Sequence, residues 1–569
     1  MRWIFRAFKL LLALSLLSVL AIALIPSKRL ANAVISELEA VLGRTVTISG
    51  DVTTSVFPRP KLTTGPVTIA NAKWGEAPKI LSAEGVDIHI DWMPLLRGDL
   101  VVRNLEFLAP KIHLETNKEG THNWELTPKV STDRSVLIRA VSSSGGVLRY
   151  IDSRDGDSET LKEFDARISV TERGMPAKVA FSALRDGVLF ETNTTLAQPR
   201  AFLSGRVSDV KTKTIYANTT LEFDGRLGIA AREFDGEMSL RTDSASDIFR
   251  GLSINISPPN ERLQLAGRVT RTAAGETYLR GGEIRVGGQS LTGDFDITTG
   301  PDRPMIKGVF AARNLSLNAL NLPLNEQGST ASGEWSDQPL SMRRLFAIDA
   351  DISLSAESLE VGSLHFGPSQ LRLNLNTGRA VLELLKLSAY GGEVVGNVVV
   401  NGRGNGSVGA DVDFENVNIR PFMGTSMVKT SGMATGDMQL LGLGDTMKEI
   451  VNSLSGEGNL TLNDATISGA NWWNMLNQRS ASSAGNTQQT AIDFAQGAMR
   501  MEAGNVRLED FALRGDGGEM RVTGDVRLGP KALDIGVSAL ADPAMRLNMS
   551  GSWSAPVYSI EAASVARTE

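Results

Sequence analysis

The 569-residue chain contains no cysteine. Disulfide bonds and thiolate metal ligands are therefore excluded, and a chain of this size must rely on burial and backbone pairing for its stability. Aromatic residues make up only 6% of the chain, and charged residues, 21%, nearly balance to a net charge of −6. No basic block interrupts the body of the sequence, so nucleic acid is not an expected partner.

Motifs that carry catalysis or bind cofactors are also missing. The GxGxxG pattern at residues 404–409 precedes an alternating segment typical of a strand, whereas a dinucleotide site needs a helix there. The pattern therefore favours a β-hairpin turn. Two S-x-x-K matches, Ser208–Lys211 and Ser426–Lys429, lack the companion motifs of penicillin-binding serine enzymes. We interpret them as chance matches.

Potential metal ligands are equally scattered. The acidic stretch Asp152–Asp157 departs from the EF-hand register at Arg154 and Gly156, which favours a solvated turn. The four histidines are far apart and have no ligand at suitable spacing: His89, His113, His122 and His365. The sequence therefore predicts no enzyme, no cofactor and no metal site.

The N-terminus contains the one apolar run long enough to cross a membrane. Leu10–Ile25 is uncharged, and it reaches the roughly 20 residues that a spanning helix needs if residues 3–9 join it. The alternative is a cleaved signal peptide ending at the A-x-A sequence of residues 31–33. Lys28 and Arg29 disfavour cleavage. We expect an uncleaved anchor through residues 3–25, with the N-terminus in the cytoplasm and the bulk of the chain across the membrane.

Most of the remaining chain alternates apolar and polar residues with a period of two. This pattern predicts antiparallel strands with one apolar and one solvated face. Helices are expected at 27–43, 243–251, 445–456 and 471–477, where capping residues and glycines bracket apolar positions. The Trp472–Trp473 pair is expected to cover an apolar edge, and the polar residues 479–490 are interpreted as a disordered linker.

A hairpin motif recurs near residues 287, 391 and 517. In each copy a Gly-Gly pair turns the chain and a second glycine follows within the next strand. The spacing is unequal, so this is no strict solenoid repeat. An open sheet and an ordinary sandwich core both fit the apolar stripes, although a sandwich normally closes within about 100 residues.

Several segments resemble the AsmA-like family. At the N-terminal end these are residues 50–62, 67–74, 93–98, 105–114 and 120–124. Later matches are residues 335–340, 387–393, 505–510 and 524–528, and the resemblance is weakest over residues 126–240. It implies an inner-membrane-anchored periplasmic protein with an elongated open β-groove, similar to bridge-like lipid-transfer proteins. It supplies no catalytic residues.

The resulting hypothesis is a mostly β protein with an elongated, curled antiparallel sheet forming an apolar groove, a few short helices and one N-terminal transmembrane helix. The expected parts are an anchor (1–26), an N-terminal β region (27–240), a middle region (241–334), a first C-terminal region (335–478), the linker (479–490) and a last region (491–569).

The expected function is binding of phospholipid acyl chains, supporting lipid transport between inner and outer membranes and envelope integrity. The alternative is an assembly factor that offers sheet edges to outer-membrane proteins. The predicted groove lining comprises Val86, Ile88, Ile90, Ile348, Ile352, Leu354, Leu371, Leu373, Leu375, Met545, Leu547 and Met549.

Overall fold

A computed structural model covers the chain. It describes residues 32, 35–36, 38–40, 42–55, 59–97, 99–124, 137–154, 156, 158–170, 176–203, 205–228, 233–245, 262–300, 303–317, 334–340, 342–423, 429–481 and 484–562. The predicted membrane anchor and most of the helix predicted over 243–251 lie outside these residues. None of the helices in the described part is long and apolar enough to cross a membrane.

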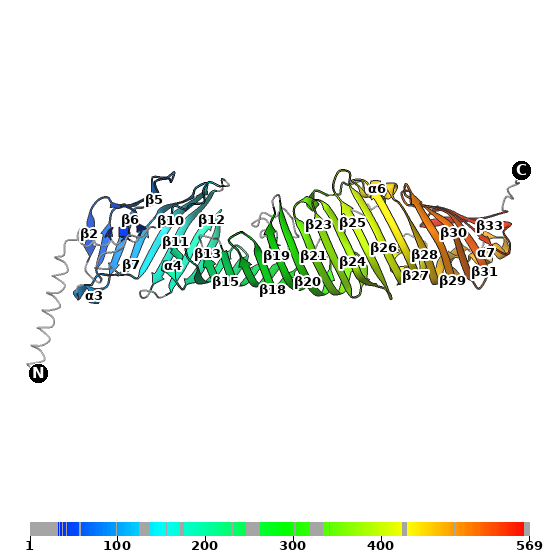
Figure 1. Cartoon of the computed structure of the whole chain (residues 1–569), viewed down its shortest axis with the longest axis horizontal. Helices are drawn as coiled ribbons and strands as arrows, with labels where there is room; N and C mark the ends of the chain where they lie inside the picture. The colour runs from blue at the N-terminus through cyan, green and yellow to red at the C-terminus, as the bar shows by residue number, and fades with distance from the viewer. Residues whose placement is uncertain are drawn as a thin grey trace, which may run out of the picture. The chain divides into compact units, whose positions relative to one another are not determined.

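The chain divides into two compact units. The N-terminal unit comprises Met1–Thr242 and Ala266–Gly275, and the C-terminal unit comprises Asp243–Leu265 and Glu276–Glu569. Strand β17 (Leu263–Arg271) contributes residues to both. In each unit the described residues are mostly β-strand with a few short helices, which confirms the predicted fold class at that level (Figure 1).

Short strands begin the N-terminal unit and a meander of longer strands follows. Its helices are α3 (Trp92–Leu96) and α4 (Pro199–Leu203). Its strands are β1 (Val46–Ile48), β2 (Val52–Ser55), β3 (Lys61–Thr64), β4 (Val67–Ala70), β5 (Lys79–Ala83), β6 (Gly85–Ile90), β7 (Val101–Leu108), β8 (Lys111–Thr116), β9 (Leu137–Ile138), β10 (Ala140–Asp152), β11 (Ser158–Val170), β12 (Ala177–Arg185), β13 (Val188–Leu196), β14 (Ser208–Tyr216), β15 (Thr219–Gly228) and β16 (Glu233–Thr242).

Pairing in this unit is mostly antiparallel. From β10 to β16 each strand pairs with the next in sequence, the arrangement that short turns produce. Parallel pairing joins β10 to both β7 and β8. Residues of the predicted helix 27–43 that are described are helical, and the helix ends at Gly43, whose N–H donates to the Glu39 carbonyl at 2.8 Å. That helix prediction is confirmed for its described part.

The C-terminal unit contains the longer strands. Its helical segments are η1 (Met342–Phe346), η2 (Arg420–Phe422), α6 (Met447–Ser453) and α7 (Trp472–Gln478). Its strands are β18 (Thr277–Val286), β19 (Gln289–Thr299), β20 (Pro304–Ser316), β21 (Asp349–Val361), β22 (Leu364–Phe366), β23 (Ser369–Asn376), β24 (Arg379–Ala389), β25 (Gly392–Asn401), β26 (Ser407–Asn418), β27 (Thr430–Leu443), β28 (Ser455–Ala470), β29 (Ala484–Glu502), β30 (Asn505–Gly515), β31 (Gly518–Arg527), β32 (Ala532–Ala539), β33 (Met545–Ser552) and β34 (Ala555–Ala562).

Two helix predictions in this unit are confirmed with small shifts. Helix α6 is capped by Thr446, and not by Asp445, in a capping box with Glu449. It ends at Ser453, so the last residues of the helix predicted over 445–456 belong to β28. Helix α7 begins after Asn471, whose side chain accepts from the Asn474 N–H. Its residues Trp472, Trp473, Met475 and Leu476 are buried in the largest core cluster, as expected of a helix that covers an apolar edge.

The linker predicted over residues 479–490 is wrong from residue 484 onward. Ala484–Thr490 form the start of β29, and the residues of this segment that pair with β28 are Ala484, Gln489 and Thr490, with Thr490 opposite Ile467. The Thr490 hydroxyl accepts from the Trp472 N–H at 3.0 Å and donates to the Ala470 carbonyl at 2.8 Å. The polar composition suggested a solvated linker, but residues 484–490 belong to strand β29.

Candidate functional site

One face of the C-terminal unit carries continuous rows of apolar side chains. Cross-strand partners can be followed through every strand from β19 to β34 except β22. We call this the first row: Gly293, Phe310, Leu354, Leu371, Leu384, Gly396, Val412, Met438, Gly458, Met499, Leu508, Gly524, Ile535, Met549 and Tyr558. Except for the Tyr558 hydroxyl, its side chains are apolar or absent.

A second row runs beside the first on the same face. Two residues along each strand from the first row, the partners are again apolar or glycine. The second row is Phe295, Gly308, Ile352, Leu373, Leu382, Val398, Ala410, Leu440, Gly456, Met501, Val506, Val526, Leu533, Gly551 and Pro556. Because successive side chains of a strand point to opposite faces, the alternating apolar residues of these strands together form one apolar face of the sheet.

The structure brings most of the predicted lining residues of this unit into these rows. Leu354, Leu371 and Met549 belong to the first row, and Ile352 and Leu373 to the second. Leu375 lies opposite Ala350 on the same face, and Ile348 precedes β21, which begins at Asp349. Leu547 and Met545 occupy β33, where they pack into the core cluster beside α7.

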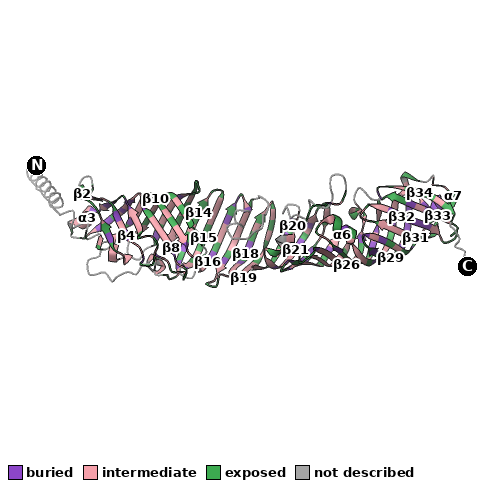
Figure 2. Cartoon of the chain, turned by 90° about the horizontal axis from the view of Figure 1, so that it is seen from above, coloured by how far each residue is buried: buried purple, intermediate pink, exposed green. Residues whose placement is uncertain are grey.

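Accessibility divides the face into covered and open parts. Between β19 and β27 side chains such as Ile352, Leu373 and Val398 are half-buried. Towards α7 the face becomes closed, with Leu547 at 0% and Met549 at 4% exposed. Figure 2 shows buried residues gathered on β31–β33. The apolar side chains of the rows are therefore more accessible between β19 and β27 than beneath α7, with the buried Leu371 as the exception.

The first three predicted lining residues lie in a closed core of the N-terminal unit. Val86, Ile88 and Ile90 are at most 4% exposed and pack with Leu62 and Leu105. Ile35, Leu38 and Leu42 of the N-terminal helix and Leu95 of α3 pack against this cluster. Val86, Ile88 and Ile90 therefore do not line an open groove as expected, because the N-terminal helix and α3 pack over them.

An apolar row also crosses the N-terminal unit. It runs through Leu62, Ile88, Leu105, Val141, Ile168, Val179, Thr194, Thr212, Phe223 and Met238. From Val141 onward these side chains are half-buried or exposed. The row is interrupted by a threonine patch, in which Thr192, Thr194, Thr212 and Thr214 hydrogen-bond to one another at 2.7–3.5 Å.

The C-terminal unit contains an apolar cavity of about 290 Å³ beneath α7. It continues the rows, since Leu508, Ile535 and Met549 of the first row line it. Its remaining lining side chains come from β27–β32, from α7 and from the segments beside η2 and β33: Met423, Thr430, Leu462, Ile467, Trp472, Ile492, Ala495, Phe511, Leu513, Val522, Val526, Leu533 and Trp553.

A larger hollow of about 670 Å³ lies along β11–β16 of the N-terminal unit. Most of its lining residues are charged or polar residues that alternate with the apolar row. Lys211 pairs with Asp224 and Lys213 with Glu222, both at 2.9 Å, and these four side chains are largely exposed. Because these charges neutralise one another at the surface, the hollow is a weaker candidate than the apolar face despite its size.

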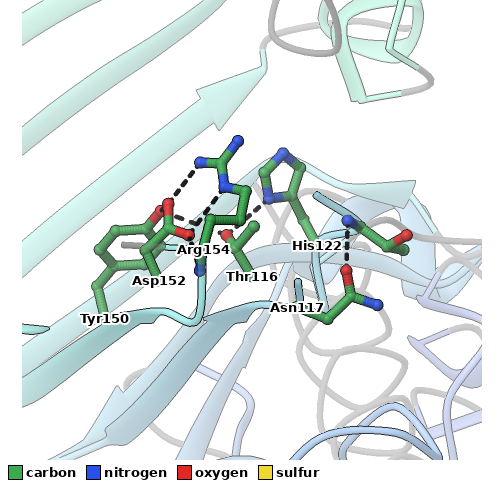
Figure 3. Close-up of polar contacts among 7 residues, drawn as sticks. Thr116, Asn117, His122, Tyr150, Asp152 and Arg154 are labelled. Atoms are coloured by element: carbon green, nitrogen blue, oxygen red, sulfur yellow. Dashed lines mark hydrogen bonds and ion pairs between the residues drawn. The ribbon is translucent and has the colours of Figure 1, made fainter. Parts of the chain in front are cut away.

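The acidic stretch that begins at Asp152 is a braced turn. The Arg154 guanidinium donates to the Asp152 carboxylate, with Nε 2.9 Å from Oδ1, and the Tyr150 hydroxyl donates to Oδ2 at 2.9 Å (Figure 3). The Arg154 hydrogen bond holds the pKa of Asp152 well below its ordinary value. Thr116 connects Tyr150 to His122 in the same cluster.

Other sequence motifs resolve into structural elements. Residues 404–406 of the GxGxxG pattern turn the chain between β25 and β26, as expected for a hairpin. Ser208 and Lys211 lie on β14, whereas Ser426 is outside the described residues. Within the part of the chain that is described, no group of three or more histidine, aspartate and glutamate side chains is placed to hold a metal ion.

These features define a class of protein: a largely antiparallel β protein whose sheets present one polar and one apolar face. A model of the AsmA family matches residues 3–157 and 309–511, more than half of the chain. The chain belongs to the AsmA family, which confirms the resemblance seen in the sequence. The match leaves out residues 158–308, which overlap the segment of weakest resemblance, residues 126–240. It also ends before residues 524–528.

A curated relative is the AsmA family protein YhjG of Escherichia coli (strain K12). It is 23% identical over 354 residues, covering 56% of this chain and 51% of the relative. This chain therefore spans about half the length of that relative. No solved structure matches the chain.

Proposed function

We propose that this protein is anchored in the bacterial inner membrane through residues 3–25 and binds lipid acyl chains along its apolar face in the periplasm. In this role it supports phospholipid movement between the inner and outer membranes. The observation that supports the proposal most is the pair of apolar rows, whose side chains between β19 and β27 are half-buried except for the buried Leu371. Membership of the AsmA family supports an envelope-related function.

The physical argument concerns what such a face does in water. A contiguous exposed apolar patch usually marks a binding surface. An acyl chain laid along the rows removes apolar area from water on both partners, at about 0.8 kcal/mol per buried CH₂. Because a bilayer shields the same chain equally well, the net free energy of transfer is small. Binding is then reversible, and a lipid moves among equivalent positions without a catalytic group.

The competing function, assembly of outer-membrane proteins, would use a sheet edge instead of a face. Strand β34 pairs with β33 and with no other strand of the described residues, so it presents such an edge. Pro556 lies in that strand and lacks the N–H that an added strand would need. Edge pairing depends on backbone atoms, so changing side chains on the apolar face would leave it intact.

The test compares two variants of the full chain, purified in mild detergent. Leu373→Glu places a charge in the second row, and Gln370→Glu places the same charge on the opposite face of β23. We expect mass spectrometry to find phospholipid with the unmodified protein and the Gln370 variant, and several-fold less with Leu373→Glu. A melting temperature measured on each variant controls for folding. Equal phospholipid on the two folded variants would rule out the proposal.

A further inference from the structure

The cavity beneath α7 is lined almost entirely by apolar side chains. Among its lining residues, those with a side-chain nitrogen or oxygen are Thr430, Trp472 and Trp553, and none carries a charge. Its volume of about 290 Å³ is close to the lower limit of small-molecule sites, about 300 Å³. Apolar cavities of about half this volume stay dry and bind small apolar molecules. The cavity is therefore suited to an apolar ligand.

The two apolar rows lead into this cavity. Leu508, Ile535 and Met549 of the first row line it, and so do Val526 and Leu533 of the second row. The same rows continue in the other direction to the half-buried side chains between β19 and β27. A ligand of the cavity can therefore extend along the face that we propose to bind acyl chains.

Strand β28 lies between the accessible part of the face and the cavity. Both rows carry glycine in this strand, with Gly458 opposite Met438 and Gly456 opposite Leu440. Because glycine has no side chain, nothing projects from these two positions of β28 into the path of a chain that follows the rows. The rows thus form a path from β27 to the cavity.

Helix α7 closes the path at the far side of the cavity. Its residues Trp472, Met475 and Leu476 are buried in the core cluster, and Trp472 itself lines the cavity. Leu547 and Met549 of β33 are at most 4% exposed in the same region. The accessible face therefore ends here, and a lipid that follows the rows towards α7 reaches a closed apolar end.

The lining decides which end of a phospholipid can enter. A phosphate, or the carboxylate of a fatty acid, would be buried in the cavity without a cation, which is costly. The methyl end of an acyl chain has no polar group to desolvate, and its burial removes apolar area from water. The methyl end can therefore occupy the cavity while the phosphate stays outside.

Building on the proposed function, we infer that the cavity beneath α7 binds the methyl end of a phospholipid acyl chain. The rest of the chain lies along the rows across β28, with the ester and the phosphate directed away from α7. The cavity is thus a discrete site at which a lipid has one fixed orientation, whereas the rows between β19 and β27 offer many equivalent positions.

Brominated lipids test this orientation, because bromine quenches the fluorescence of nearby tryptophans. The full chain, purified in mild detergent and freed of bound lipid, is loaded with phosphatidylcholine that carries bromine near either the methyl ends or the esters of its chains. We expect the methyl-end bromine to cause the larger loss of fluorescence. The difference should be on the order of a quarter of the emission, since Trp472 and Trp553 are two of the eight tryptophans in the chain.

Two leucine substitutions in β29 provide a variant and its matched control. Ala495 lines the cavity and is 2% exposed, so Ala495→Leu takes up part of the cavity and should reduce the difference between the two bromine positions. Ala498 precedes Met499 of the first row, lies opposite Asn459 and faces the other side of the sheet. Ala498→Leu should therefore keep the difference. The melting temperature of each variant shows whether it is folded.

The outcomes separate this inference from the proposed function. Equal quenching by the two lipids on the unmodified protein would overturn the methyl-end site and leave the proposed function standing. Stronger quenching by bromine near the esters would also overturn it, because the lipid would then enter head first. If the protein retains neither lipid, the proposed function fails as well. The comparison on the unmodified protein decides the matter even if Ala495→Leu does not fold.

Discussion

A few side chains at the end of β10 make the stability of the N-terminal unit depend on pH. Asp152 accepts hydrogen bonds from Arg154 and Tyr150 in a largely buried position, with its side chain 6% exposed. Because the Arg154 hydrogen bond lowers the pKa of Asp152 in the folded protein, the folded state binds this proton less readily than the unfolded chain does. The interaction therefore stabilises the unit above the ordinary carboxyl pKa of about 3.9.

This stabilisation should disappear as the pH falls below about 4 towards the lowered pKa of the folded state. We expect Asp152→Asn to lower the free energy of unfolding by about 1.5–3 kcal/mol near pH 7, the range for hydrogen bonds to charged groups. The variant should also lose less stability than the unmodified protein between about pH 7 and pH 3. Urea unfolding at the two pH values measures both effects.

Asp224 supplies the matched control. It pairs with Lys211 at 2.9 Å, but its side chain is 63% exposed, so Asp224→Asn should change the free energy of unfolding by less than about 1 kcal/mol. A similar loss of unfolding free energy in Asp152→Asn and Asp224→Asn would show that burial of the Asp152 carboxylate adds no stability.

Element-scale geometry explains the recurring hairpin motif. The glycine that follows the Gly-Gly pair is Gly293, Gly396 or Gly524, and all three lie in the first row. At each, an added Cβ would lie 2.1–2.2 Å from a carbonyl oxygen of the neighbouring strand: Val309, Asp411 or Asp534. The glycine therefore permits two strand backbones to approach closely at the same point of the motif, a requirement that the sequence repeat alone did not reveal.

Gly396→Ala should therefore destabilise the C-terminal unit. The residue has φ of +134° and its Cβ would lie 2.2 Å from the Asp411 carbonyl oxygen, so we expect a loss of about 1–3 kcal/mol. Gly409→Ala in the facing strand is the control, because its nearest neighbour, the Leu440 carbonyl oxygen, would be 3.4 Å away. That variant should keep or slightly raise the melting temperature. Equal melting temperatures for the Gly396→Ala and Gly409→Ala variants would contradict the argument that Gly396 permits a close approach of the two strands.

Sequence patterns predicted antiparallel strands and their apolar faces, but they predicted neither the few parallel pairs nor which faces are covered. Ile352 and Leu373 alternate with polar residues just as Ile88 and Ile90 do, yet the first pair is half-buried and the second lies under a helix. The alternation is also the same for parallel and antiparallel neighbours, so the parallel pairing of β20 with β21 left no signal. Cover and direction depend on contacts between segments distant in sequence, which local periodicity does not encode. Trp472 was expected to cover an edge, but its unpaired indole is visible only in the packed structure.

At the scale of the whole molecule, the question is whether the apolar faces act along their length or at one point. Each unit by itself has a row that crosses many strands, and most of its members are chemically alike. A lipid that moves among equivalent positions must visit all of them, whereas a protein with a single binding site would hold lipid at only one. Position-by-position crosslinking separates these behaviours.

A photo-crosslinking amino acid placed singly along the faces gives the measurement. We expect lipid adducts in cells at Ile352, Leu382, Val398 and Leu440 of the second row, and at Val179 and Phe223 of the N-terminal unit, because all six are half-buried on an apolar face. Asn397 and Glu222 are the controls, since each neighbours a tested residue in its strand and faces the opposite way. Adducts confined to one position would mean a local binding site. Adducts at the control positions would mean that the apolar face has no special affinity for lipid, and absence of adducts from one unit would restrict lipid binding to the other.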